Sequence, residues 1–392
     1  MEKMFKRSIV ATAVTAAALA STVAMAKPAT ETVDLYGQVA VSMWQYGEHA
    51  IGGGDQPITF ENESRFGLRG SADLERAPKF IWQLEGGNVG DAGAGSGLGV
   101  RDTFAGFEFE DGGKVRVGRM LTPLYQMIDW PYSGQRAGAV FDWGGDVLGG
   151  GRYDRQSNMI RYDSAKMGGL NFSVAAGRGT ESDDGSNFYG LSASYNVGIV
   201  TFHAGYEAGS DRSNSSLDSF YNSYLNQVPG NKPSFDKIKT IEGSTTSDTN
   251  AALIGFEAYF DNGFGVYAAY KMEAADYDDA TITLNEDVKD STNKKEIALK
   301  GASIDQDSIS VGVVYGGVEN WQFKANYAAN FNADVDNDGS SFEATGTEDS
   351  IFSVQALYFL DPAAIVYARP YVISKNDSDH EFGYGLGLEY YF

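Results

Sequence analysis

The residue types that most often do chemistry in proteins are scarce in this chain of 392 residues. It has no cysteine, which excludes disulfide bonds, zinc–thiolate clusters and thiol catalysis. Its three histidines are His49, His203 and His380, and none lies in a motif with a nucleophile or a metal ligand. An enzyme such as a surface protease or a phospholipase needs a nucleophile paired with a base. The sequence therefore indicates a protein that is not an enzyme and that uses no cofactor.

One acidic stretch could bind a metal ion. Asp334, Asp336 and Asp338 alternate ahead of Gly339, like the opening of a calcium-binding loop. The bidentate glutamate that closes such a loop is missing, because Thr345 stands in its place. The three aspartates are therefore weak candidates for a metal site, and an acidic external loop is the simpler interpretation. Ca²⁺ or Mg²⁺ could still bridge this acidic region to an anionic surface.

The overall composition excludes several classes of protein. The chain has 30 Lys and Arg against 53 Asp and Glu, a net charge of −23, which excludes a nucleic-acid partner. Hydrophobic residues make up 42 % and aromatic residues 13 % of the chain, which is too much for a disordered protein. Beyond the first thirty positions, no apolar run is long enough for a transmembrane helix.

The N-terminal segment has the order of a secretory signal peptide. Lys3, Lys6 and Arg7 make a positive start, an apolar stretch follows, and an Ala-Met-Ala sequence provides a cleavage site. We therefore predict that residues 1–26 are removed on export and that residues 27–392 form one folded domain.

The end of the chain shows which kind of element positions the remaining residues. From Phe382 to Phe392 every second residue is apolar or aromatic, and most of those between are glycine. A two-residue period indicates a β-strand with one apolar face. This face has aromatic residues at both ends, as in a strand that crosses a lipid bilayer between its two interfaces. The strand predicted from Val33 alternates in the same way.

Sixteen segments of about ten residues, the length of a tilted membrane-spanning strand, follow this pattern. They cover residues 33–44, 60–72, 79–88, 100–110, 114–121, 155–163, 170–178, 187–196, 199–208, 250–261, 264–275, 305–316, 320–330, 350–360, 363–374 and 381–392. The alternation slips in the fourth and fifth segments, which indicates a bulge there.

The connections between these segments alternate in length. Short connections such as 111–113 and 261–263 have tight-turn residues, whereas those between them, such as 209–249 and 276–304, are long and polar. A membrane-spanning sheet must also close, because hydrocarbon offers no partner to an unpaired amide. We therefore predict an all-β fold: a transmembrane antiparallel β-barrel of 16 strands, wide enough for a water-filled channel. A soluble β-sandwich, the alternative, has no reason to sort its connections by length.

Short motifs along the chain resemble those of the Gram-negative general porin family. They are residues 34–37 (DLYG), 65–70 (RFGLRG), 104–107 (FAGF), 118–119 (GR) and 161–162 (RY), together with the terminal Phe392. The resemblance implies a homotrimer of barrels in the outer membrane, in contact with lipid and lipopolysaccharide. It implies short periplasmic turns and long extracellular loops, with the third loop folded into the lumen. It also implies an assembly signal at the C-terminus, to which we assign Phe392 and Tyr390.

The resemblance also implies a pore constriction on the third loop, residues 122–154. The stretch 141–146 resembles the acidic constriction segment of the family, so Asp142 and Asp146 are expected to face the pore. Asp129 is a further acidic candidate in the same loop. An ordinary surface loop is the alternative for these carboxylates.

Basic residues are expected on the wall opposite the acidic segment. By position, the basic ladder of the family falls on Arg65, Arg101 and Arg155. The alternation of the strands independently turns four arginines toward the lumen: Arg65, Arg69, Arg155 and Arg161. Gln38 stands where the family commonly has a lysine, which makes it a polar lumen residue and weakens the basic side. Arginines that merely form salt bridges with loops are the simpler alternative.

Charges on two sides of a narrow pore predict a transverse electric field that favours polar solutes. The first hypothesis is a porin for passive diffusion of small hydrophilic solutes and ions, and the net charge predicts a preference for cations. The alternative is an oligosaccharide-selective porin in which Trp130 and Trp143 of the third loop stack on sugar rings. The other tryptophans, Trp44, Trp82 and Trp321, are expected in the aromatic belts at the membrane interfaces.

Overall fold

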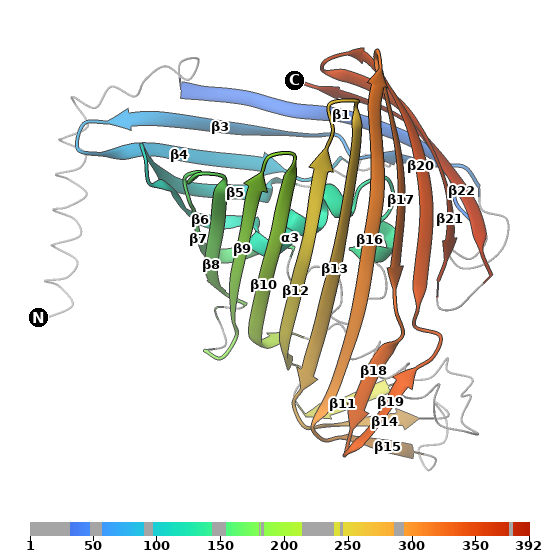
Figure 1. The fold of residues 1–392 in the computed structure, drawn as a ribbon. Helices are drawn as coiled ribbons and strands as arrows, with labels where there is room; N and C mark the ends of the chain where they lie inside the picture. Colours follow the sequence, from blue (N-terminus) through green and yellow to red (C-terminus); the bar gives the residue numbers. More distant parts are fainter. Residues whose placement is uncertain are drawn as a thin grey trace, which may run out of the picture.

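Antiparallel strands form most of the chain in the computed structural model (Figure 1). The model describes residues 32–47, 57–89, 97–142, 154–179, 181, 184–213, 239–243, 246–285, 294–375 and 379–392. The predicted signal peptide, residues 1–26, lies outside this part. None of the helices within these ranges is long and apolar enough to cross a membrane.

Sixteen strands make the wall of a barrel, as the sequence predicted. They are β1 (Val33–Gln45), β3 (Arg65–Leu74), β4 (Ala77–Gly86), β5 (Leu98–Phe109), β6 (Gly113–Leu121), β7 (Arg155–Asp163), β8 (Leu170–Arg178), β9 (Asn187–Val197), β10 (Val200–Ser213), β12 (Thr246–Tyr259), β13 (Phe264–Tyr277), β16 (Ala302–Val318), β17 (Trp321–Asn330), β20 (Asp349–Asp361), β21 (Ala364–Ser374) and β22 (Glu381–Tyr391). Each pairs antiparallel with the next of these along the chain.

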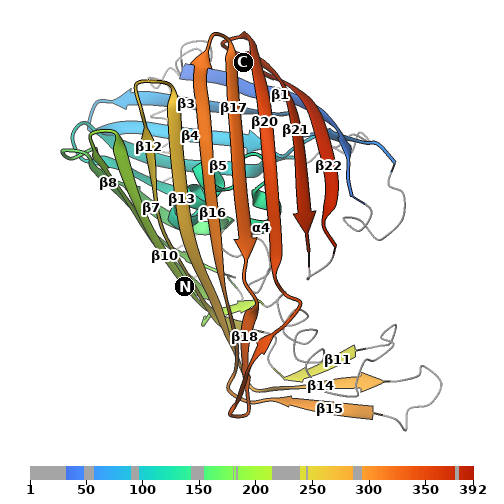
Figure 2. The same ribbon diagram turned by 45° about the vertical axis from the view of Figure 1, so that its right-hand side comes forward.

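The first and last strands close the barrel. β1 pairs with β22 from Gln38 opposite Tyr391 to Gln45 opposite Tyr384. The C-terminal residue continues this ladder, because Gly37 N–H donates to the Phe392 carbonyl at 2.9 Å and Phe392 N–H donates to the Gly37 carbonyl at 3.1 Å. Figure 2 shows these strands side by side. Closure pairs the edge amides that lipid would leave unsatisfied.

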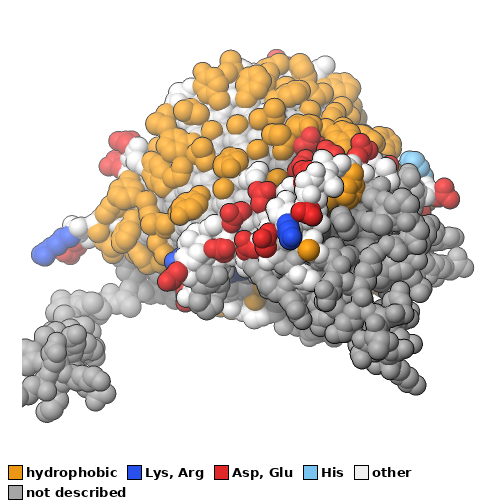
Figure 3. Space-filling view, turned by 90° about the horizontal axis from the view of Figure 1, so that it is seen from below, with side chains coloured by type: hydrophobic (Ala, Val, Ile, Leu, Met, Phe, Trp, Pro, Cys, Tyr) orange, Lys and Arg blue, Asp and Glu red, His pale blue; other side chains and the backbone are white. Residues whose placement is uncertain are grey.

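The strand alternation separates the two faces of the wall. On β16, Val311 and Val313 point outward, with 48 % and 46 % of their surface exposed. Ser308 and Ser310, at alternate positions of the same strand, point inward and are buried. Hydrophobic side chains gather over the outer wall in Figure 3, with acidic side chains gathered beside them. The outer face is therefore the lipid-facing one, and the inward face is small or polar.

Some irregularities of the wall fall where the sequence pattern slips, and one does not. The second predicted strand is divided into β2 (Thr59–Asn62) and β3, which both pair with β1. The register of β6 against β7 shifts between Gly118 and Met120, opposite Asn158, which has a φ of 57°. The register of β5 against β4 also shifts, between Leu84 and Gly86, so the irregularity predicted in the fourth segment is confirmed, whereas the extra residue beside β6 belongs to β7.

Two of the long connections contain strands that the sequence did not indicate. β11 (Lys239–Gly243), β14 (Ala280–Asn285) and β15 (Lys294–Leu299) form a separate three-stranded sheet. It lies at the rim opposite the short turns (Figure 1). These residues belong to the segments 209–249 and 276–304, which we expected to be loops.

The acidic stretch that resembled a calcium loop is a β-hairpin. β18 (Ala333–Asn337) and β19 (Ser340–Ala344) pair with each other, and β18 also pairs with β16. Asp338 and Gly339 make the turn with φ of 51° and 76°, as in the Asp-Gly turns of tight hairpins. Among the described residues, no group of three or more His, Cys, Asp or Glu is arranged to hold a metal ion. This geometry corrects the metal interpretation of Asp334, Asp336 and Asp338.

The hydrophobic core lies inside the barrel, beneath the third long connection. That connection contains α3 (Pro123–Met127), a short π-helical segment η1 (Ile128–Tyr132) and α4 (Gly138–Phe141). Leu124, Ile128, Tyr132, Val140 and Phe141 are fully buried between these elements and the wall. The described part of the third loop, residues 122–142, is therefore folded into the lumen.

Candidate pore constriction

The third loop begins with local signals that direct it inward. Thr122 caps α3, since its hydroxyl accepts the Tyr125 N–H at 3.2 Å, and Pro123 opens the helix. The helical run is broken at Trp130, whose backbone is extended (φ −145°, ψ 130°). This break turns the indole away from the buried side of the loop and leaves 58 % of it exposed. Trp130 is one of the two tryptophans that the alternative hypothesis of a sugar-stacking porin predicted for this loop.

Polar side chains on three neighbouring strands hold the backbone of the loop. The carbonyls of Phe141, Tyr132 and Val140 accept hydrogen bonds from Lys271 Nζ at 2.5 Å, Ser310 Oγ at 2.6 Å and Asn330 Nδ2 at 2.9 Å. These donors lie on β13, β16 and β17, at positions that the alternation turns inward. Lys271 is also 2.7 Å from Glu273, and both side chains are almost fully buried.

The tip of the loop is attached to two separate parts of the wall. Gln135 accepts a hydrogen bond from Tyr267 Oη of β13 at 2.7 Å. The guanidinium of Arg136 lies 4.6 Å from the Trp44 ring centroid, 5.1 Å from that of Tyr46 and 5.8 Å from that of Tyr371. Cation–π attraction of this kind is stronger where water is excluded.

Trp44 does not lie in an interfacial belt, which corrects that prediction. It is 2 % exposed and stacks on Tyr46 inside the barrel, with a centroid separation of 6.1 Å. The reason is its position on β1, where it points to the same face as Ser42, whose hydroxyl accepts the indole N–H at 2.8 Å. Trp321, by contrast, stacks on Phe323 on the outer face.

The structure brings three predicted arginines together opposite one predicted carboxylate. Arg65, Arg101 and Arg155 all lie within electrostatic range of Asp129. Burial raises the pKa of Asp129, while Arg101, Arg155 and Arg65 act to lower it.

Two of these arginines have partners on the wall itself. Arg101 pairs with Glu85, and Arg155 pairs with Asp102 at 2.5 Å. Arg65 Nη1 is 3.5 Å from the side-chain oxygen of Asn88. Gln38 lies beside this group, opposite Arg65 on β3 and Tyr391 on β22. The positive charge at this side of the lumen is therefore partly compensated by neighbouring carboxylates.

The other acidic candidates differ from Asp129. Asp142 is 5 % exposed and accepts a hydrogen bond from Tyr125 Oη at 3.0 Å, so it lies between the loop and the wall. Burial raises the pKa of Asp142 to about 7, against the lowering effect of Lys271. Asp146 and Trp143 lie outside the described residues.

We expect the neutral form of Asp142 to stabilise the fold. Its carboxyl has a higher pKa in the folded than in the unfolded chain, so its contribution to stability is complete below about pH 4 and is lost as the pH rises through about 7. Asp142→Asn imitates the neutral form and should stabilise the protein by roughly 2–4 kcal/mol at pH 8 but hardly at pH 4. Thermal unfolding in detergent across this range measures the effect, with exposed Asp111→Asn as the control. A variant less stable than the wild type at pH 8 would contradict this account.

The remaining basic candidates have structural partners. Arg161 is 3 % exposed, and its guanidinium donates to the Leu121 carbonyl at 2.7 Å and to Gln126 Oε1 at 2.5 Å, at the start of the third loop. Arg69 is largely exposed and pairs with Asp34 at 2.8 Å. At the C-terminus, Tyr390 and Phe392 stack with their rings about half exposed. Their assembly role stays a prediction.

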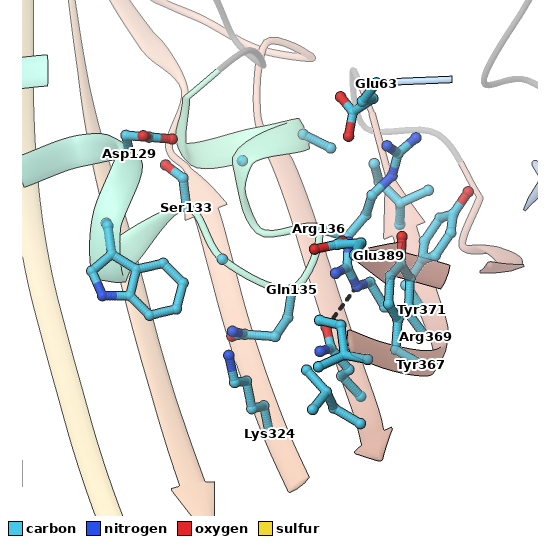
Figure 4. Close-up of a pocket in the computed structure, with 18 of the residues that line it drawn as sticks. Glu63, Asp129, Ser133, Gln135, Arg136, Lys324, Tyr367, Arg369, Tyr371 and Glu389 are labelled. Carbon is cyan, nitrogen blue, oxygen red and sulfur yellow. Dashed lines mark hydrogen bonds between the residues drawn. The ribbon is translucent and has the colours of Figure 1, made fainter. Parts of the chain in front are cut away.

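A cavity of about 760 Å³ lies between the loop tip and the wall from β17 to β22 (Figure 4). Both signs of charge line it: Glu63, Asp129, Arg136, Lys324, Arg369 and Glu389. Tyrosines also line it: Tyr46, Tyr367, Tyr371 and Tyr391. Lys324 Nζ lies 4.9 Å from the Trp130 ring centroid, and Arg369 Nε donates to Gln355 Oε1 at 2.8 Å.

Arg136, Lys324 and Arg369 were not among the residues predicted from the sequence. Strand alternation could have found the last two, because Lys324 alternates with the outward Trp321 and Phe323, and Arg369 lies between apolar residues of β21. No local pattern marks Arg136.

Comparisons with known proteins agree with this architecture. A family model described as Gram-negative porin matches residues 12–378. The chain is 38 % identical over 297 residues to a chitoporin of Vibrio furnissii, which covers 70 % of this chain and 76 % of the relative. Among solved structures, a loop-deletion mutant of OmpT from Vibrio cholerae superposes with a TM-score of 0.63 at 16 % identity, covering 92 % and 99 % of the two chains.

A second solved structure has the same fold. An anion-selective porin of Comamonas acidovorans superposes with a TM-score of 0.62 at 16 % identity, again over 92 % of this chain and 99 % of that one. At such identity the likeness concerns the fold alone. The match of the family model over nearly the whole chain, on a closed barrel with an apolar outer face, shows more: this chain belongs to the Gram-negative porin family, whose members are channel proteins of the outer membrane rather than enzymes.

Proposed function

We propose that this porin is a passive, water-filled channel that prefers oligosaccharides among hydrophilic solutes. The observation that carries the proposal is Trp130, a large aromatic side chain that is 58 % exposed inside the lumen. Exposing the apolar surface of an indole to water costs free energy, which a bound ligand can recover by covering it. The apolar face of a sugar ring fits such a flat aromatic surface.

The surroundings of Trp130 support this choice. The adjoining cavity combines tyrosines with charges of both signs, a lining that suits an uncharged solute rich in hydroxyl groups. The relative from Vibrio furnissii is named for chitin, so oligomers of N-acetylglucosamine are the first class of sugar to test.

Single-channel recording in a planar bilayer tests the proposal. Millimolar chitotriose should interrupt the open-channel current in discrete, reversible events whose frequency rises with the sugar concentration. Maltotriose, which lacks the acetamido groups, serves as the comparison for specificity. An open-channel current that neither sugar alters would contradict the proposal and would favour simple diffusion.

The second candidate function is a general diffusion channel with a preference for cations. It is favoured by the pairing of Arg101 with Glu85 and of Arg155 with Asp102, which compensates positive charge near Asp129, and by the net charge of −23. In a salt gradient of KCl, the reversal potential should indicate that K⁺ permeates more readily than Cl⁻. A reversal potential of the opposite sign would contradict this preference.

We also expect the barrel to associate with copies of itself, as a homotrimer, and to contact lipid and lipopolysaccharide. The support for lipid is the apolar outer wall, which needs a hydrocarbon environment. The support for the trimer and for lipopolysaccharide is the resemblance to the family.

A further inference from the structure

A second cavity, of about 460 Å³, lies on the side of α3 that faces β5 to β10. We call it the rear cavity. Its lining includes Gln126, Trp130, Asn171, Ser192, Ser194 and His203. Trp130 therefore borders both this cavity and the larger one beside the loop tip. A sugar ring stacked on the indole would place its neighbour in the chain of sugars next to one of the two cavities.

The charged groups of the rear cavity largely compensate one another. Asp163 accepts hydrogen bonds from Arg116 Nη2 at 2.6 Å, Arg161 Nε at 2.8 Å and Ser173 Oγ at 2.8 Å. Asp102, which also lines the cavity, pairs with Arg155 at 2.5 Å. Lys114 also lines the cavity, and its charge interacts with that of Asp163. Such a site favours a neutral, hydrogen-bonding ligand over a free ion.

His203 is fixed in orientation but not fully hydrogen-bonded. Its Nδ1 is 3.0 Å from Ser194 Oγ, and the edge of the ring packs against Tyr132 of the loop, with centroids 5.9 Å apart at 87°. Its Nε2 is buried and faces the Glu257 carboxylate at 3.6 Å, which is an ion-pair distance when the ring is protonated and longer than an ordinary hydrogen bond.

The polar groups continue along the inner wall beyond His203. Tyr259 Oη donates to Glu257 Oε2 at 3.2 Å, so Ser194, His203, Glu257 and Tyr259 form a row across β9, β10 and β12. Hydroxyl groups of a sugar can act as donors and acceptors at once, which matches a row that mixes both kinds of group.

We propose that the rear cavity is a saccharide subsite, in which Ser194 and His203 hydrogen-bond a sugar unit whose neighbour stacks on Trp130. The proposal rests on the proposed function and extends it by assigning the residues that hold the second sugar unit. Ser194 and His203 then prolong the time that an oligosaccharide stays bound, whereas Trp130 contributes most of the affinity.

Dwell times of chitotriose in single-channel recordings test the subsite. His203→Ala and Ser194→Ala should each shorten the blocked intervals about threefold to tenfold, the size expected from one lost hydrogen bond, with little change in the association rate. His203→Asn keeps a hydrogen-bonding group and should restore part of the dwell time. His380→Ala changes an exposed histidine that directly precedes β22 and does not line the rear cavity, so it is the matched control and should behave as the wild type.

The conductance measured without sugar distinguishes a variant that has lost a contact with the sugar from one in which the third loop has moved. His203 touches Tyr132 of the third loop, whereas in the part of the chain that the structure describes the Ser194 hydroxyl bonds to His203 and not to the loop, so Ser194→Ala should shorten the dwell time at unchanged conductance. Wild-type dwell times in both alanine variants would overturn the subsite, and would leave the proposed function standing if Trp130→Ala still weakens the block. A wild-type channel that chitotriose does not block would overturn both.

Discussion

Replacing Lys271 by methionine is expected to loosen the third loop and to destabilise the barrel. The ammonium is 1 % exposed, lies 2.7 Å from the buried Glu273 carboxylate and donates to the Phe141 carbonyl at 2.5 Å. Methionine fills a similar volume but removes the positive charge and the donor. Removing one partner of a buried ion pair costs about 3–5 kcal/mol, far more than a surface pair would. The temperature at which the folded band disappears from detergent gels should fall, and the single-channel conductance should become larger and noisier.

Two further variants define the origin of this effect. Lys79 forms an exposed pair with Glu108 at 3.7 Å, so Lys79→Met should change stability by about 0–1 kcal/mol. The double variant Lys271→Met with Glu273→Gln also removes the buried negative charge. It should recover much of the stability but not the hydrogen bond to the Phe141 carbonyl. If Lys271→Met behaves like Lys79→Met, the loop is not held at this point.

Replacing Trp130 by alanine is expected to remove most of the sugar affinity. The indole is exposed to both cavities, and an aromatic stacking platform contributes about 1–3 kcal/mol per ring in comparable systems, which is about fivefold to 150-fold in the dissociation constant. The fold should tolerate the change, because more than half of the side chain contacts no protein. The dissociation constant of chitotriose from current block at several concentrations measures the effect.

Matched tryptophan variants make this test specific. Trp130→Phe keeps a flat ring and should retain most of the affinity. Trp321 lies on the outer wall against Phe323, so Trp321→Ala should leave the sugar block unchanged. A Trp130→Ala channel with the dissociation constant of the wild type would show that sugars pass without stacking there.

The wall of the barrel was predictable because its signals are local. β7 and β8 begin and end at the residues expected from alternation and turn chemistry, 155–163 and 170–178. A two-residue period is set by neighbours in the sequence, and so is a tight turn. The hairpin around Asp338 and Gly339 carries the same kind of turn signal, but its alternating aspartates were interpreted as metal ligands instead.

The interior was less predictable because it is built from contacts distant in the sequence. Gln135 and Tyr267 are 132 residues apart, and Phe141 and Lys271 are 130 residues apart. No local pattern in the sequence indicates that either pair is in contact. The family resemblance pointed to Asp142 and Asp146 on the third loop and to Arg65, Arg101 and Arg155 on the wall, and the structure places these three arginines near Asp129, another acidic residue of that loop. The resemblance could not show that Asp142 is covered by Tyr125 and the wall, because burial depends on how the whole loop packs.

The double attachment of the loop tip has a mechanical consequence. A hollow cylinder flattens readily under sideways pressure unless something ties its sides together. Gln135 is tied to β13, and its neighbour Arg136 to the aromatic rings on β1 and β21, so the tip acts as a brace across part of the cross-section. The same segment that narrows the passage should therefore also keep the arc of wall between these strands round when the surrounding bilayer is compressed.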